Sequence, residues 1–70
     1  MNIKLTKREY DVLLRLPMQN IDIADELGLK VTYIEQIVYR IMSKLHVNNR
    51  TAAVVQAIKH ELVEIYNFIL

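Results

Sequence analysis

The sequence of 70 residues contains no cysteine and no tryptophan, and it has only one glycine and one proline. The absence of cysteine excludes disulfides and thiolate metal sites. The two histidines, His46 and His60, do not complete a tetrahedral zinc site, so we expect no metal or other cofactor. Because glycine and proline are scarce, long helices are favoured over tight β-hairpins. A chain of this length forms one domain with a thin core, which depends on ideal helix packing or on self-association.

Long apolar runs and an excess of one charge are also missing. No stretch reaches the roughly 18–20 apolar residues of a membrane helix, and residues 1–7 lack the apolar run of a signal peptide, so we expect a cytoplasmic protein. Nine basic and eight acidic residues give a formal net charge of +1, so any DNA contact needs basic residues gathered on one face. No motif arranges a histidine and an acid around Ser43, and no glycine-rich phosphate loop is present, so an enzyme is not expected.

The first predicted helix covers residues 7–16. Thr6 and Glu9 have the spacing of a capping box, in which the threonine hydroxyl accepts from the Glu9 amide and the glutamate side chain reaches back. Pro17 ends the helix, because proline has no amide hydrogen to donate and restrains the residue before it.

The second predicted helix covers residues 21–27, with Asn20 as its N-cap and Gly28 as the left-handed residue at its end. Ala24 has a small side chain at the position where the following helix would cross. Gly28 can adopt the positive φ angle that the turn requires. This spacing is typical of a helix-turn-helix, although a generic helical hairpin with an incidental glycine would share it. Apolar residues stand where they would fill the angle between the helices, at Ile23, Leu27, Leu29, Ile34 and Ile37.

The third predicted helix begins at Val31 or Tyr33 and ends at Leu45. Thr32 and Glu35 have the spacing of a second capping box. The apolar residues of this helix recur at helical spacing and predict one buried face, made of Ile34, Ile37, Val38, Ile41 and Leu45.

The fourth predicted helix begins near residues 49–51 and runs to about Ile69, since no glycine or proline interrupts it. Its apolar band is wider than a core-facing stripe needs, which favours a symmetric dimer through this helix. The alternative is that its end folds back over the first helix and covers Leu13 and Leu16. The residues predicted to form the dimer interface are Val54, Ile58, Leu62, Ile65, Tyr66 and Ile69.

Over about residues 5–58 the chain resembles the LuxR/GerE-type helix-turn-helix domain. The opening Leu5-Thr6-Lys7-Arg8-Glu9 is similar to the first helix of that family, and Ile23-Ala24-Asp25-Glu26-Leu27-Gly28-Leu29 to its second helix and turn. Asn49-Arg50-Thr51 is similar to the start of its fourth helix. The resemblance implies an all-α, four-helix domain spanning residues 1–70, in which the third helix enters the major groove of DNA and the fourth forms the dimer contact.

With its apolar stripe turned inward, the third helix presents an outward face as the candidate DNA-binding surface. Gln36 suits adenine, Arg40 suits guanine or phosphate, and tyrosine hydroxyls suit phosphates. The alternatives are a solvated face without function and a protein-binding face. For Arg50 a structural role is as well supported as a phosphate contact: it could donate hydrogen bonds to carbonyl groups at the end of a neighbouring helix. The predicted DNA-binding residues are Thr32, Tyr33, Gln36, Tyr39, Arg40, Lys44 and Arg50.

Two functions from different classes fit this pattern. The first is a small transcription regulator that binds double-stranded DNA as a homodimer. The second is an interaction protein that has lost its DNA contacts and antagonises another transcription regulator by pairing with it. Glu35 and Ile37 favour the second, because the family commonly has a lysine and a histidine there, as does the short loop of residues 17–22, which has no basic residue. A positive stripe along the third helix would favour the first function, and a neutral or acidic surface the second.

Overall fold

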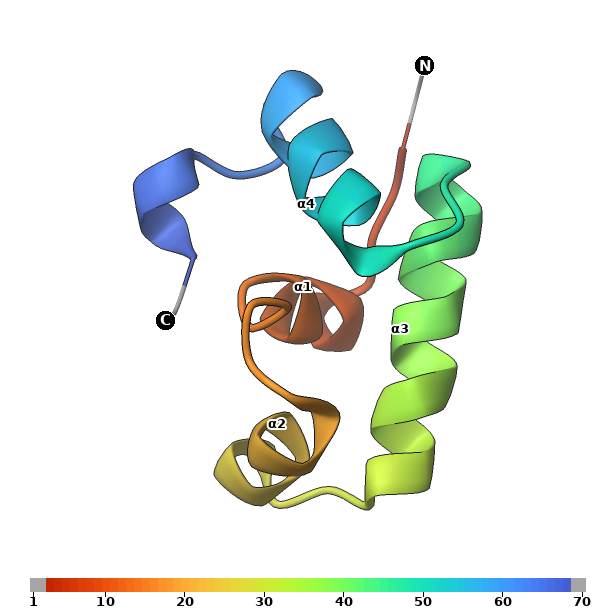
Figure 1. Ribbon diagram of the computed structural model, residues 1–70, viewed down its shortest axis with the longest axis vertical. Helices are drawn as coiled ribbons and strands as arrows, with labels where there is room; N and C mark the ends of the chain where they lie inside the picture. The colour runs from red at the N-terminus through yellow and green to blue at the C-terminus, as the bar shows by residue number, and fades with distance from the viewer. Residues whose placement is uncertain (1–2, 69–70) are drawn as a thin grey trace.

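The computed structural model describes residues 3–68, and this part of the chain contains helices and no strand. The elements are α1 (Lys7–Leu13), α2 (Asn20–Leu27), α3 (Val31–Leu45), α4 (Arg50–Lys59) and a short 3-10 helix, η1 (Ile65–Asn67) (Figure 1). The prediction of an all-α fold with four α-helices is confirmed.

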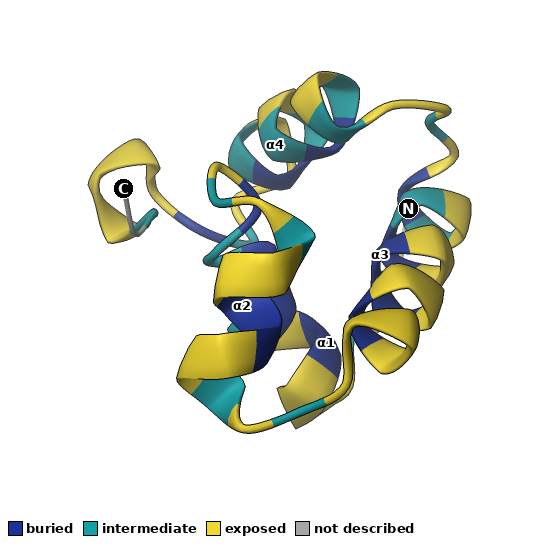
Figure 2. Ribbon diagram, turned by 60° about the horizontal axis from the view of Figure 1, so that its bottom comes forward, coloured by how far each residue is buried: buried dark blue, intermediate teal, exposed yellow. Residues whose placement is uncertain are grey.

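Helix α3 runs along one side of the molecule, and α1, α2 and α4 each pack against it (Figure 1). One face of α3 is buried and the opposite face is exposed along much of its length (Figure 2). Small residues on the neighbouring helices, Ala24, Ala53 and Ala57, allow close packing and are themselves buried. The buried side chains of α3 are the ones that the apolar spacing predicts: Ile34, Ile37, Val38, Ile41 and Leu45.

Helix α1 begins with the predicted capping box. The Glu9 amide donates to Thr6 Oγ1 at 3.1 Å, and the Thr6 amide donates to Glu9 Oε1 at 2.9 Å. The helix ends at Leu13, so the predicted end at residue 16 was too late. The amide of Leu16 bonds to the Leu13 carbonyl at 3.2 Å, because the chain tightens into shorter turns as it approaches Pro17.

Two predicted caps are wrong. Asn20 is the first residue of α2 rather than its N-cap, which is Gln19 and makes no side-chain cap bond. The side-chain oxygen of Asn20 instead accepts a hydrogen bond from Arg50, so it is not available to the helix end. At α3 the N-cap is Lys30, also without a side-chain bond, and Thr32 lies inside the helix, so no capping box forms there.

Three helices end in the same way, with a residue in the left-handed conformation followed by an apolar residue. The φ angles are 68° at Gly28 and 58° at both His46 and Glu61. In each case the amide of the apolar residue bonds to the carbonyl five positions earlier, at 2.8–3.0 Å, as in a Schellman motif. The pairs are Gly28–Leu29, His46–Val47 and Glu61–Leu62.

The third of these motifs corrects the predicted extent of the fourth helix. Helix α4 ends at Lys59 and the chain reverses at Glu61, so the helix does not continue toward residue 69. Val63 is buried, and Leu62 and Phe68 pack against the core, so the segment after α4 folds back onto the molecule. The reversal is possible because Glu61 adopts a left-handed backbone conformation that glycine occupies most often. Whether this segment covers Leu13 and Leu16, as the alternative requires, stays a prediction.

Replacing His46 by glycine is expected to stabilise the protein by about 0.5–1 kcal/mol, because glycine adopts a positive φ without the steric penalty of a β-carbon. The His60→Gly variant is the matched control, since His60 has a φ of −89°. Thermal unfolding measures both variants. A melting temperature for His46→Gly at or below that of the unaltered protein would contradict the expectation, and His60→Gly should not gain stability.

Candidate nucleic-acid interface

Helices α2 and α3 and the turn between them form a helix-turn-helix. Gly28 has a φ of 68° and no atom lies within 4 Å of the place of an added β-carbon, so the glycine serves the backbone conformation rather than a close approach. Ala24 is 3% exposed where the helices meet. Ile23, Ile34 and Ile37 are fully buried between the elements, as the sequence predicts. Packing inside the motif therefore fixes the direction of α3.

The outer face of α3 carries most of the predicted DNA-binding residues. All five that lie on this face are exposed, and the aromatic side chains of Tyr33 and Tyr39 are 38% and 71% exposed. Glu35 shares this face, so an acid stands among the predicted contacts. The buried stripe faces α1, α2 and α4, and the opposite face of α3 is exposed (Figure 2). The exposed residues are Thr32, Tyr33, Gln36, Tyr39 and Arg40.

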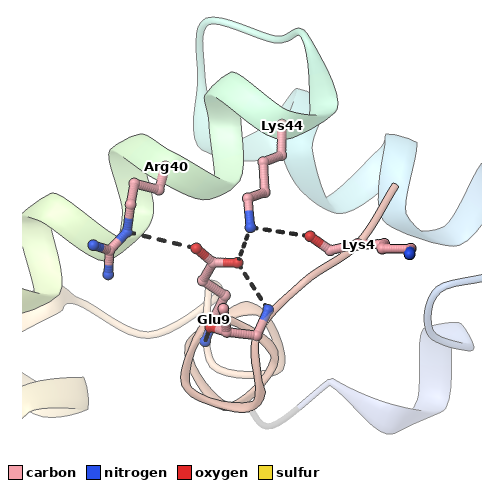
Figure 3. A network of polar contacts seen from close by, with 5 residues as sticks. Lys4, Glu9, Arg40 and Lys44 are labelled. Atoms are coloured by element: carbon pink, nitrogen blue, oxygen red, sulfur yellow. Dashed lines mark hydrogen bonds and ion pairs between the residues drawn. The ribbon is translucent and has the colours of Figure 1, made fainter. Parts of the chain in front are cut away.

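Lys44 is held in a network that joins α1 to α3. Its Nζ lies 2.6 Å from Glu9 Oε1 and 3.0 Å from the backbone oxygen of Lys4 (Figure 3). Arg40 approaches the other carboxylate oxygen, with its Nε 3.5 Å from Glu9 Oε2. Glu9 is only 3% exposed, so a nearly buried carboxylate on α1 faces two cations of α3.

The environment of Glu9 keeps its carboxylate ionised. Burial acts to raise the pKa of Glu9, but hydrogen bonds from Lys44 and the Thr6 amide and the charges of Lys44 and Arg40 bring it below its ordinary value. Sequence reasoning gave Glu9 a capping role only, and no local signal could show that Arg40 and Lys44, so much later in the chain, would reach it.

Arg50 is bound to the chain segment between α1 and α2. Its Nη2 donates to the carbonyls of Leu16 and Met18 at 2.8 Å and 2.6 Å, and its Nε donates to the Leu16 carbonyl at 3.3 Å. Its Nη1 donates to the side-chain oxygen of Asn20. Burial lowers the pKa of Arg50, although a guanidinium stays charged at neutral pH. These hydrogen bonds match the structural role that the sequence offered for Arg50 as an alternative to a phosphate contact. They occupy all three nitrogens of its side chain.

The charge around the helix-turn-helix is mixed. Residues 20–45 contain four acidic and three basic side chains. Asp22, Asp25 and Glu35 are exposed, as is Lys30 at the start of α3. Because Arg40 and Lys44 both face Glu9, α3 does not present a continuous positive stripe.

The residues predicted to form a dimer interface are spread over α4, the segment that follows it and η1 instead of one helix. Ile65 and Tyr66, on η1, are 72% and 77% exposed. They border a surface groove of about 610 Å³ between the end of α4 and the following segment, with Ile58, Glu61, Val63 and Glu64 as the other lining residues. Val54, Ile58 and Leu62 are half-buried against the core, and Ile69 lies outside the described residues.

Neither a metal-binding cluster nor a membrane-spanning helix is present among residues 3–68. No group of three or more histidine, cysteine, aspartate or glutamate side chains is placed to hold a metal ion there. None of the helices in this range is long and apolar enough to cross a membrane.

The fold and the exposed face of α3 define a helix-turn-helix domain of the four-helix type. Residues 4–57 match the model of the family described as bacterial regulatory proteins, luxR family, and the chain belongs to this family. It is also 38% identical over 61 residues to the uncharacterized transcriptional regulatory protein YxjL of Bacillus subtilis (strain 168). That alignment covers 84% of this chain but 28% of the relative, so the chain spans little more than a quarter of that protein's length.

Proposed function

We propose that this chain is a small transcription regulator that binds duplex DNA by placing α3 in the major groove. One observation carries the proposal: α3 is braced by three helices on one side and presents polar and aromatic side chains on the other. Membership of a family of regulatory proteins supports it. A regulator of this kind acts on the chromosome, so we expect the protein in the cytoplasm and expect no enzymatic activity.

The exposed side chains of α3 differ in the part of the DNA that each can bind, either the edge of a base or a phosphate. Gln36 can donate to and accept from the edge of an adenine, and Arg40 can make paired hydrogen bonds to a guanine or a phosphate. Thr32, Tyr33 and Tyr39 carry hydroxyl groups that donate to phosphate oxygens and fix the position of the helix. Lys44 and Arg50 are hydrogen-bonded within the fold. In this proposal they support DNA binding by holding α3 and the loop between α1 and α2 in place.

The regulator acts as a homodimer in this proposal, with α4 and the segment after it at the contact. Ile65 and Tyr66 are the most exposed large apolar residues of the described chain, and they border the groove that begins at Ile58. A symmetric contact there would remove apolar surface from water.

The second candidate function is that of an antagonist that pairs with another transcription regulator. The mixed charge of the helix-turn-helix favours it, since Glu35 stands on the face that would meet phosphates and Arg40 and Lys44 are shared with Glu9. Tyrosine and arginine on α3 also suit a protein interface. Failure to recover any partner regulator from native extract would count against this candidate.

The variants Arg40→Ala and Gln36→Ala test the proposed DNA-binding face. Each is expected to weaken binding to a duplex selected from genomic fragments by roughly 5–150-fold, because a paired contact to a base contributes about 1–3 kcal/mol. Fluorescence anisotropy measures the affinity, and circular dichroism checks the fold.

Lys59→Ala is the matched control for Arg40→Ala, because it removes the same charge from an exposed position at the end of α4. Its affinity is expected to stay within about threefold, as befits the loss of a single distant charge. Equal, small effects for all three variants would show that α3 does not read DNA through these residues.

A further inference from the structure

We infer that Glu9 is a positioning residue for DNA recognition: it holds Arg40 by Nε, so that the two terminal nitrogens of the guanidinium face outward to a base or phosphate. This inference rests on the proposed function. It assigns a role in the readout of DNA to a residue of α1 that does not lie on the α3 face.

The first step is that Glu9 is itself fixed. It is 3% exposed and ionised, and its backbone lies in the first turn of α1. Its Oε1 accepts from the Thr6 amide at 2.9 Å and from Lys44 Nζ at 2.6 Å. These bonds leave Oε2 directed at Arg40 Nε, 3.5 Å away. The carboxylate is therefore a rigid anchor for the arginine.

The second step is the direction of the Arg40 guanidinium. Nε faces Glu9, while the terminal nitrogens lie on the far side of the group (Figure 3). Within residues 3–68, no hydrogen bond or ion pair of the protein occupies those terminal nitrogens, and the side chain is 49% exposed. Arg50 is the contrast, because all three of its nitrogens donate to protein oxygens.

An anchored Arg40 loses less conformational entropy when it binds DNA. A free arginine side chain loses rotamer entropy when it is fixed, and a planar guanidinium that is already oriented loses less. Glu9, Lys44 and Arg40 together carry a net charge of +1, so the cluster still attracts DNA. Glu9 thus raises the contribution of Arg40 to affinity, although as an acid it would by itself repel phosphate.

A double-mutant cycle of Glu9→Gln and Arg40→Ala tests the inference. In the unaltered protein Arg40→Ala is expected to weaken binding about 30-fold, and in the Glu9→Gln background only about threefold, so that the two substitutions couple by about tenfold. Anisotropy is measured at a temperature at which circular dichroism shows every variant folded, because Glu9→Gln also weakens the capping box.

Glu26→Gln is the matched control, since it removes the same charge from the helix-turn-helix and releases Arg15, which Glu26 binds at 3.0 Å. Its effect is expected to add to that of Arg40→Ala without coupling. A purely structural role of Glu9 would give the same additive result for Glu9→Gln, and that result would overturn the inference.

The anchor is also tested without DNA. In the free protein, the Nε–Hε resonance of Arg40 is expected to be resolved and to shift and broaden in Glu9→Gln, because the carboxylate partner is lost. If this signal responds as expected but the unaltered protein binds no duplex, the proposed function fails and the positioning role falls with it. If the protein binds duplex and the resonance is unaffected by Glu9→Gln, the positioning role alone is overturned.

Discussion

Replacing Ile37 by alanine is expected to lower the free energy of unfolding by about 3 kcal/mol. Ile37 is fully buried in the middle of α3, so the substitution removes apolar contacts and leaves a cavity. A domain of this size has a total stability of roughly 4–10 kcal/mol. The melting temperature should therefore fall by roughly 12–24 °C, which thermal or urea unfolding followed by circular dichroism would measure.

Ile21→Ala is the control for this prediction, because it makes the same change at a side chain of α2 that is 62% exposed. Its stability should stay within about 0.5 kcal/mol of the unaltered protein. Similar losses for the two variants would contradict the packing described here. At full burial the Ile37 side chain packs the helix-turn-helix.

Replacing Arg50 by alanine is expected to destabilise the protein by about 3 kcal/mol. The substitution removes charged hydrogen bonds to the carbonyls of Leu16 and Met18 and leaves these groups, and the side chain of Asn20, without their partner. The loop between α1 and α2 would lose its connection to α4. Urea unfolding should show a lower midpoint in a single cooperative transition.

Arg50→Lys separates shape from charge at this position. A single ammonium cannot reach three acceptors that a planar guanidinium bonds together, so the lysine is expected to recover less than half of the loss. Lys59→Ala again serves as the control for the loss of one positive charge and should leave the stability almost unchanged. Full stability of Arg50→Lys would mean that charge, and not the fork of donors, fixes the loop.

The features that were predictable from the sequence depend on neighbours in the chain. The capping box at Thr6, the left-handed turn at Gly28 and the apolar stripe of α3 each need only a few consecutive residues, and all three are present in the structure. The exposure of the α3 face follows from the stripe, because the side chains opposite to it have nothing to pack against. The role of that face in DNA binding stays a prediction.

The features that were missed depend on residues distant in sequence or on an unusual backbone conformation. The end of α4 was missed because Glu61, and not glycine, adopts the left-handed conformation there. The spacing predicts Asn20 as a cap, but its side chain accepts from Arg50 on another helix, which no local pattern indicates. Lys44 also contacts Glu9 of α1, a partner that no local pattern indicates, and its role as a DNA contact stays a prediction. The end of α4 therefore depends on the backbone conformation of one residue, and the role of Asn20 depends on a tertiary contact.

The measurement that tests the central claim most directly is an anisotropy titration of the unaltered protein against labelled genomic duplex fragments at low and moderate salt. If α3 binds DNA, a subset of fragments should bind tightly, and the logarithm of the binding constant should fall linearly with the logarithm of the salt concentration as counterions are released. The absence of binding even at low salt would contradict DNA binding and leave the antagonist of another regulator as the function to test.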